Sequence, residues 1–326
     1  MFSDRVLDLD LDAESARIEE SIREIVGARL RRRGAVVGIS GGIDSALVTA
    51  LCARALGPER VLGLLMPERD SSPESARLGA LVAQSQGVRV EVVDLEPALD
   101  AMGCYRYRDE AIRSVVPEYG AGWKSKIVLP EIRDEARLNF FHVVAQSPEG
   151  ETVRRRLPYG AYLQIVASTN MKQRTRKITE YFHADRLHYA VAGTPNRLEY
   201  DQGFFVKGGD GAADFKPIAH LYKTQVYALA AAVGIPDEVL RRPPTTDTYS
   251  LAQSQEEFYF ALPYPKMDLC LWALNHGVPA EDAAAVVGLT VAQVRNVYRD
   301  IEAKRGTTLV LHLPPILVEA VPEIRH

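Results

Sequence analysis

The spacing of apolar side chains divides the first hundred residues into alternating helices and strands. In residues 14–31 apolar positions recur every three or four residues, which predicts an amphipathic helix. Short runs that are apolar throughout follow at intervals, and such runs are typical of strands buried on both faces. We therefore expect strands over 35–39, 61–66 and 88–95, and helices over 44–56 and 73–86.

This order of elements predicts the fold class. Strands that alternate with helices at this spacing pair in parallel, and the crossover helices cover the sheet. We expect an α/β fold with a doubly wound, Rossmann-like parallel sheet, and a ligand site at the carboxyl ends of the strands.

The alternation stops after Leu95. Residues 95–169 are far more than the dozen or so that a crossover connection needs. Within them, 140–157 predicts a hairpin around a Ser-Pro-Glu-Gly turn. We interpret about 97–160 as an insertion folded onto a single domain of 1–326, because it is neither rich in Gly and Ser nor of low complexity.

The rest of the chain returns to ordinary elements. We expect a helix over 160–182, a strand over 187–192, a Gly-rich loop at 208–214, a helix over 222–233, a polar loop at 241–256, and a helical C-terminal part at about 266–326.

Composition excludes several classes of protein. The 326 residues carry 39 Lys and Arg against 43 Asp and Glu, so the charge does not favour phosphate-dominated nucleic-acid binding. Three cysteines do not build a disulfide framework. The acidic N-terminus does not resemble a signal peptide, and no apolar run approaches the roughly 18 residues of a membrane span. We expect a cytoplasmic enzyme.

The junction after the first strand carries the most specific chemistry. Ser40-Gly41-Gly42-Ile43-Asp44-Ser45 lies between a predicted strand and a predicted helix, where backbone N–H groups and the helix dipole favour an anion. Asp44 adds a carboxylate suited to a phosphate-bound Mg²⁺. No Lys follows, so this is not the mononucleotide loop GxxxxGK[ST]. The alternative is a simple Gly-rich turn.

This motif resembles the SGGxDS fingerprint of the PP-loop ATP pyrophosphatases. Four further segments resemble those of the NAD synthetase family, in the same order and at compatible spacings. They are NMKQRTR (170–176), GTPNRLE (193–199), KGGDGAADFKPIAHLYKTQ (207–225) and PPTTD (243–247). The resemblance covers about 35–95 and 165–265, and it implies the adenine nucleotide alpha-hydrolase-like version of the expected fold.

The resemblance also implies a reaction. ATP activates the carboxylate of deamido-NAD as an acyl-adenylate, and ammonia then gives the amide, with release of AMP and pyrophosphate. Lys223 and Mg²⁺ would spread the charge that develops when two anions meet. The family further implies a homodimer. Only about 34 residues precede the first strand, so we expect ammonia to arrive free or from a separate glutaminase partner.

Site residues follow from the resemblance, position by position. Catalytic roles fall to Asp44 and Lys223, and Asp44 and Glu199 match the metal ligands. Arg174, Lys207 and Asp214 match positions that bind deamido-NAD. The ATP-binding positions are Gly38, Ile39, Ser40, Gly41, Gly42, Ile43, Asp44, Ser45, Thr194, Lys223 and Thr245.

Each of these residues also has a simpler interpretation. Lys223 could be a solvated helix residue and Glu199 a surface acid. Asp210 and Asp214 stand beside glycines and could be turn formers. Arg154-Arg155-Arg156 is interpreted as a solvated hairpin face rather than a nucleotide site.

Departures from the family pattern lie on the side of the acid substrate. Gln173 replaces an Ala, and Gln255 replaces an acid. Where the family has a His-Lys-Arg element shortly before Pro-Pro, this chain has Lys304-Arg305, extra residues and an isolated His312 before Pro314-Pro315. An amide synthetase of the same chemistry that uses a different carboxylate is therefore the alternative function.

A third possibility belongs to another class. Residues 278–301 predict a helix, a Gly turn and a second helix with Arg295 and Arg299, like a DNA-binding helix-turn-helix. The segment also carries several acids, so we favour a helical pair that packs on the domain, and no nucleic-acid or membrane partner is expected.

Overall fold

A parallel sheet of four strands forms the centre of the computed structural model, which describes residues 2–128, 141–244, 249–251, 259–260 and 262–324. The strand order is β3-β2-β1-β7, and all three pairings are parallel. β1 therefore has β2 on one side and β7, which comes much later in the chain, on the other. The predicted α/β class is confirmed. The strands are β1 (Ala35–Gly38), β2 (Val61–Leu65), β3 (Arg89–Val92) and β7 (Ala190–Ala192).

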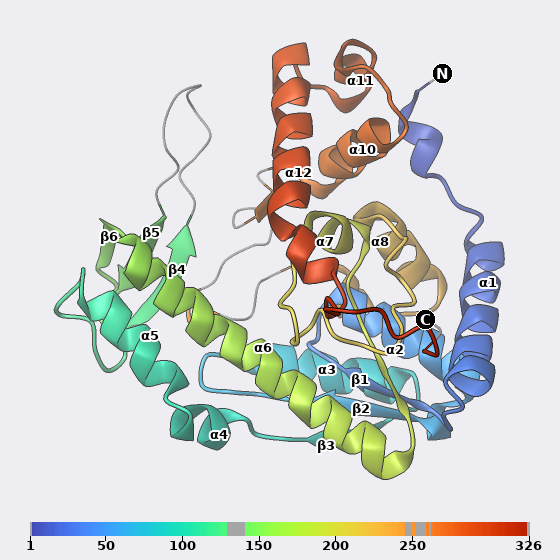
Figure 1. The fold of residues 1–326 in the computed structure, drawn as a ribbon, viewed down its shortest axis with the longest axis horizontal. Helices are drawn as coiled ribbons and strands as arrows, with labels where there is room; N and C mark the ends of the chain where they lie inside the picture. The colour runs from blue at the N-terminus through green and yellow to red at the C-terminus, as the bar shows by residue number, and fades with distance from the viewer. Residues whose placement is uncertain (1, 129–140, 245–248, 252–258, 261, 325–326) are drawn as a thin grey trace.

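Helices cover both faces of this sheet (Figure 1). Ala35 and Val37 of β1 pack into the larger core with α1, α2, α3 and α8, whereas Val36 points the other way, into a cluster with Ala184 of α6. Successive side chains of a strand alternate between faces, so one short apolar strand serves two layers. The helices are α1 (Leu11–Arg23), α2 (Ile43–Leu56), α3 (Pro73–Ser85), α4 (Glu96–Ala101), α5 (Cys104–Arg113), α6 (Tyr159–Leu187), α7 (Arg197–Gln202), α8 (Lys223–Ala232), α9 (Asp237–Leu240), α10 (Tyr264–Asn275), α11 (Ala280–Val287) and α12 (Val291–His312). The π-helix η2 (Glu24–Arg29) continues α1, and η1 (Asp4–Leu7) and η3 (Pro58–Arg60) are short 3₁₀ helices.

The predicted boundary between the helix over 160–182 and the strand over 187–192 was wrong. The strand expected from residue 187 begins at Ala190, because α6 continues to Leu187 and ends at His188 in the left-handed conformation, with φ of 59°. The apolar Leu187 belongs to the buried face of the helix and not to the strand. A periodic pattern continued directly by an apolar run leaves this boundary unmarked in the sequence.

The segment predicted as an insertion holds a second sheet. Its strands are β4 (Lys124–Val128), β5 (His142–Gln146) and β6 (Thr152–Arg156), paired antiparallel in chain order, so the predicted hairpin is confirmed. The inner face of this sheet packs on α5 and on the first part of α6. Figure 1 shows α6 running from this small sheet to the parallel sheet. Arg154, Arg155 and Arg156 lie exposed along β6.

A buried cluster of charges joins α5 and α6 to the turn after β2. Lys172 Nζ donates to Glu68 Oε1 at 3.1 Å and to Asp70 Oδ2 at 2.5 Å, and Arg108 also bonds to Asp70. The Tyr105 hydroxyl donates to Glu68 Oε2 at 2.9 Å. Burial alone would raise the pKa of Asp70, but the charges of Lys172 and Arg108 lower it overall. The turn is thus tied to both helices by groups that have little access to water.

The predicted C-terminal helices are present as α10, α11 and α12. Ala283, Ala284 and Val294 are buried between them, as expected for a pair that packs on the domain. Arg295 forms an ion pair with Glu281, and Arg299 donates to Asn296. Among the described helices, none is long and apolar enough to cross a membrane.

Candidate active site

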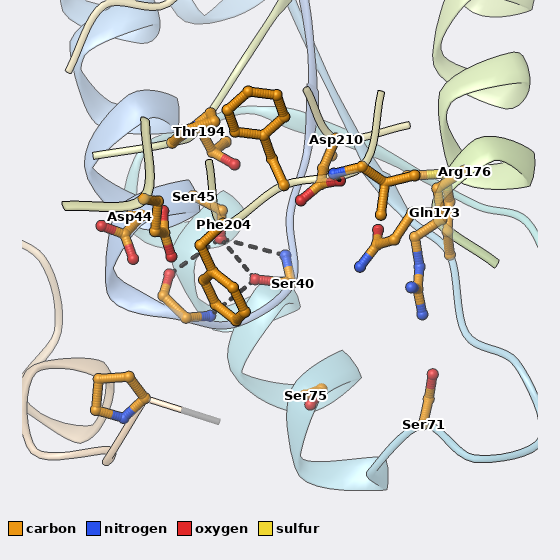
Figure 2. A pocket seen from close by; sticks show the side chains of 18 of the residues that line it. Ser40, Asp44, Ser45, Ser71, Ser75, Gln173, Arg176, Thr194, Phe204 and Asp210 are labelled. Atoms are coloured by element: carbon orange, nitrogen blue, oxygen red, sulfur yellow. Dashed lines mark hydrogen bonds between the residues drawn. The ribbon is translucent and has the colours of Figure 1, made fainter. Parts of the chain in front are cut away.

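A cavity of about 510 Å³ opens at the carboxyl ends of β1 and β7. The loop after β1 and the segment after β7 both line it, as the sequence predicts for a doubly wound sheet. Its size suits a nucleotide-sized ligand. Figure 2 shows Ser40, Asp44 and Ser45 on one side of it and Gln173 and Arg176 on another.

The loop Ser40–Ser45 is closed by its own hydroxyl groups. Ser40 N donates to Ser45 Oγ at 3.2 Å, Gly42 N donates to Ser40 Oγ at 3.3 Å, and Ser45 Oγ donates to Gly42 O at 3.0 Å. Gly41 has φ of 74°, and a Cβ there would lie 2.4 Å from the backbone oxygen of Ser75. Gly41 is therefore required where the loop meets α3, and the loop presents its backbone to the cavity.

Asp44 is the meeting point of the charged groups. Its Oδ1 accepts a hydrogen bond of 3.0 Å from Asn196 Nδ2, and its Oδ2 accepts one from Lys223 Nζ. Asn196 also caps α7, where it accepts from the backbone N–H of Glu199 at 3.2 Å. The GTPNRLE segment is thereby placed against the loop after β1, and Glu199 is brought beside Asp44.

Lys223 is held by a residue that the sequence gives no reason to choose. Asp268 of α10 accepts from the backbone N–H groups of Lys223 and Thr224, at 3.2 and 2.7 Å, and so caps the start of α8. Both Asp268 and Lys223 are fully buried. The ammonium group of Lys223 is thereby fixed, and it reaches the cavity through Asp44 rather than lining it.

The pKa values of Lys223 and Glu199 are both raised, with different consequences for their charge. Burial lowers the pKa of Lys223, but the neighbouring carboxylates of Asp44 and Glu199 raise it overall, so the amine stays charged. Burial and the charge of Asp44 raise the pKa of Glu199 to about 8. Asp44 and Glu199 are therefore two carboxyl groups close together in a buried site, and Glu199 holds its proton near neutral pH. A divalent cation bound between them would remove the repulsion between the two negative charges.

The other site predictions differ in their outcome. Thr194 lines the cavity, and of the eight positions 38–45 only Gly41 does not. Thr245 lies outside the described residues. Arg174, Lys207 and Asp214, which were predicted to bind deamido-NAD, are not among the described lining residues of the cavity. Their side chains form hydrogen bonds to backbone groups instead.

Two of those three are joined to each other. Arg174 Nε donates to the carbonyl of Lys207 at 3.2 Å, and Lys207 Nζ donates to the carbonyls of Val310 and Leu313 at 2.8 and 3.0 Å. Asp214 accepts from Val191 N at 2.7 Å, so its carboxylate also anchors β7. The simpler interpretation of Asp214 as a turn former therefore leaves out a contact with the sheet.

Several cavity residues were missed by reading the sequence. Ser71 comes from the turn before α3 and Ser75 from its first turn, and Figure 2 places them below Ser40. Arg242 follows α9. The position of Arg242 directly before PPTTD was the available signal. Ser71 and Ser75 had none, because serines are common around the start of any helix. Asp210, weighed above as a turn former, also lines the cavity.

The sequence is similar to those of known proteins. The model of the NAD synthase family matches residues 14–119 and 151–307. The NH(3)-dependent NAD(+) synthetase of Mesorhizobium japonicum is 58% identical over 318 residues, which are 98% of this chain and 100% of that protein.

Two solved structures share the fold. The NMN synthetase of Francisella tularensis superposes with a TM-score of 0.64 at 18% identity, over 95% of this chain and 99% of that one. The NH3-dependent NAD synthetase of Campylobacter jejuni gives 0.63 at 20% identity, over 96% and 100%. The family model covers most of the chain, including both sides of the cavity, so this protein belongs to the NAD synthase family.

Proposed function

We propose that this protein is an ATP-dependent ligase that converts deamido-NAD to NAD with ammonia. The observation that carries the proposal is the 58% identity to an NH(3)-dependent NAD(+) synthetase along that protein's whole length. The geometry agrees, because an intact PP-loop, Thr194 and the Asp44–Lys223 pair meet at one cavity. The nitrogen donor is ammonia, as the name of that relative states for the relative itself.

The chemistry of the first step is attack by a carboxylate oxygen on the α-phosphorus of ATP. One phosphorus–oxygen bond forms, the bond to the β-phosphate breaks, and pyrophosphate leaves with the electron pair. The protein contributes position and positive charge rather than a nucleophile. Lys223 is a buried cation joined to this end of the cavity by its ion pair with Asp44, which raises the pKa of its ammonium group.

Mg²⁺ fits the carboxylates present. Among the described residues no group of three or more His, Cys, Asp or Glu side chains is arranged to hold a metal. Asp44 and Glu199, which lie beside each other at the cavity, would be the protein ligands, with phosphate oxygens and water completing the shell, as Mg²⁺ commonly accepts. When bound, the ion neutralises charge on the phosphates.

The raised pKa of Glu199 predicts how stability depends on pH. The folded protein holds a proton that the unfolded chain has lost above its ordinary pKa of 4.5, so this group destabilises the fold progressively from about pH 4.5 to about pH 8. The slope is at most about 1.4 kcal/mol per pH unit for one proton. Urea unfolding across this range should show that Glu199→Gln removes this contribution.

Mg²⁺ affinity should rise over the same interval, because the cation must displace that proton. Titration with Mg²⁺ at pH 6, 7 and 8 measures it. Equal affinity at all three values, or a pH-stability curve of Glu199→Gln identical to the parent, would contradict this assignment.

The activity test uses purified protein with ATP, Mg²⁺ and ammonium. Deamido-NAD is supplied in one reaction and nicotinate mononucleotide in another, since a protein of the same fold is an NMN synthetase. We expect NAD, AMP and pyrophosphate in equal amounts from the first reaction. If AMP forms in the reaction with nicotinate mononucleotide and not in the reaction with deamido-NAD, the alternative of a different carboxylate substrate is favoured.

A homodimer is the second part of the proposal. α6 exposes two pairs of large apolar side chains, Tyr159 with Leu163 at its start and Ile178 with Phe182 near its end, and the last two are 69% and 63% exposed. Exposed large apolar side chains grouped on one helix are typical of an interface. We propose that a second copy of this chain binds to these side chains of α6.

Phe182→Glu should therefore give a monomer at micromolar concentration, because it places a charge in the interface. Light scattering coupled to gel filtration measures the mass. Leu309→Glu, at an exposed apolar position on α12, is the matched control and should leave the mass unchanged. A monomeric parent protein would rule out the dimer.

A further inference from the structure

Arg242 joins the PP-loop to the start of α3. Its Nη1 donates to the carbonyl of Gly41 at 3.2 Å, and its Nη2 donates to Ser75 Oγ at 2.7 Å. Gly41 and Arg242 are 201 positions apart in the chain. The side chain also lines the cavity, together with Pro243 and Pro244.

The place that Arg242 occupies is suited to phosphate oxygens. α2 begins at Ile43 and α3 at Pro73, and residues of both first turns line the cavity. Figure 2 shows Ser40 and Ser45 on the PP-loop side and Ser75 on the α3 side. Two helix N-termini therefore face one end of the cavity, and the guanidinium bridges them. Positive helix ends and a cation at one place favour the most highly charged part of a ligand.

The other cations around the site are committed elsewhere. Lys223 is fully buried and paired with Asp44. Lys177 donates to Glu180 at 2.6 Å, and Figure 2 shows Arg176 beside Gln173, away from the PP-loop. Arg242 has five N–H donors, of which the two hydrogen bonds described above use two. It is thus the described lining cation best placed at the PP-loop.

We infer that Arg242 binds the terminal phosphates of ATP and the pyrophosphate that leaves. This rests on the proposed function, in which the bond between the α- and β-phosphates breaks and its electron pair goes to pyrophosphate. A guanidinium forms paired hydrogen bonds with phosphate oxygens and so stabilises the charge that grows on the leaving group. Pro243 and Pro244 follow directly and restrict the backbone next to Arg242, while its hydrogen bonds to Gly41 and Ser75 hold the side chain at the loop.

The test measures binding of inorganic pyrophosphate alone and of AMP alone by calorimetry. Arg242→Ala should weaken pyrophosphate binding about 10- to 100-fold, the equivalent of losing charge-assisted hydrogen bonds of roughly 1.5–3 kcal/mol. AMP affinity should change less than twofold. Arg242→Lys, which keeps the charge without the paired geometry, should lie between the parent and Arg242→Ala.

Arg241→Ala is the matched control. Arg241 is 80% exposed and pairs with Asp237, so its loss should leave both affinities unchanged. Unchanged pyrophosphate affinity in Arg242→Ala would overturn the inference. An equal loss for AMP and pyrophosphate would overturn it as well, because it would mean that Arg242 only shapes the loop through Gly41 and Ser75.

Binding of pyrophosphate does not require the acid substrate, so this result is separate from the activity test. A protein that binds pyrophosphate through Arg242 but does not amidate deamido-NAD would retain the inference and lose the proposed substrate. If Arg242→Ala fails to fold, as thermal unfolding would reveal, Arg242→Lys decides the outcome: parent-like affinity for pyrophosphate would then overturn the inference.

Discussion

Replacing Lys223 with methionine should lower kcat about 100- to 1000-fold, the loss expected when one preorganised charge is removed from a developing anion. Methionine retains the length of the side chain, so packing changes little while the charge disappears. Lys223 has no exposed surface, and water therefore cannot substitute for the ammonium group. Steady-state release of AMP from saturating ATP, ammonium and deamido-NAD measures the effect.

The same substitution should also leave a signature at Glu199. The charge of Lys223 lowers the pKa of Glu199 in the parent protein, so its removal should raise that pKa further. The pH at which Glu199 loses its proton should therefore move upward, and the pH dependence of Mg²⁺ binding measures this change. Lys266→Met, at a lysine that donates only to the carbonyl of Gly288 among its described contacts, is the control and should be parent-like. A Lys223→Met enzyme with kcat within tenfold of the parent would contradict the assigned role.

Lys172→Met should cost about 3–5 kcal/mol in the free energy of unfolding, the range for breaking a buried ion pair from one side. The Lys172 side chain is 2% exposed, and its partners Glu68 and Asp70 are 0% and 6% exposed. Removing the ammonium group leaves two buried carboxylates with Arg108 as the remaining described cation. Urea unfolding at neutral pH measures the cost.

A double variant separates the charge effect from packing. Lys172→Met combined with Glu68→Gln removes one of the stranded carboxylates, so we expect it to be more stable than Lys172→Met alone. Non-additivity of this kind is the mark of groups in direct contact. A cost below about 1 kcal/mol for Lys172→Met would mean that the cluster is relieved by water or by rearrangement.

Local elements followed from the sequence because their causes are local. The strands β1 and β2 and the helix α2 were predicted from apolar spacing, and the PP-loop was found because its hydroxyl groups, glycines and carboxylate lie within six consecutive residues. The predicted boundary between α6 and β7 was wrong because no local feature of the sequence marks it. Leu187 is apolar in either element, and only the left-handed conformation of His188 ends the helix.

The contacts of the residues predicted to bind the acid substrate could not be derived from sequence motifs. Arg174 and Lys207 were matched one motif at a time, and the structure joins them near the end of α12 rather than along the described cavity. Their motifs state a residue type and an order, but not what each side chain contacts. Their roles toward deamido-NAD stay predictions.

The sequence by itself determined the class of sheet, the location of the phosphate-binding loop and, through several ordered motifs, the family. Only the tertiary structure decided which distant groups each charged side chain meets: Lys223 meets Asp44, Asp268 meets the start of α8, Lys172 meets Glu68, and Arg242 meets the carbonyl of Gly41. Apolar periodicity and turn chemistry act over a few residues and can be read along the chain. Contacts between residues 45 to 201 positions apart depend on strand order and helix packing, which no local spacing records.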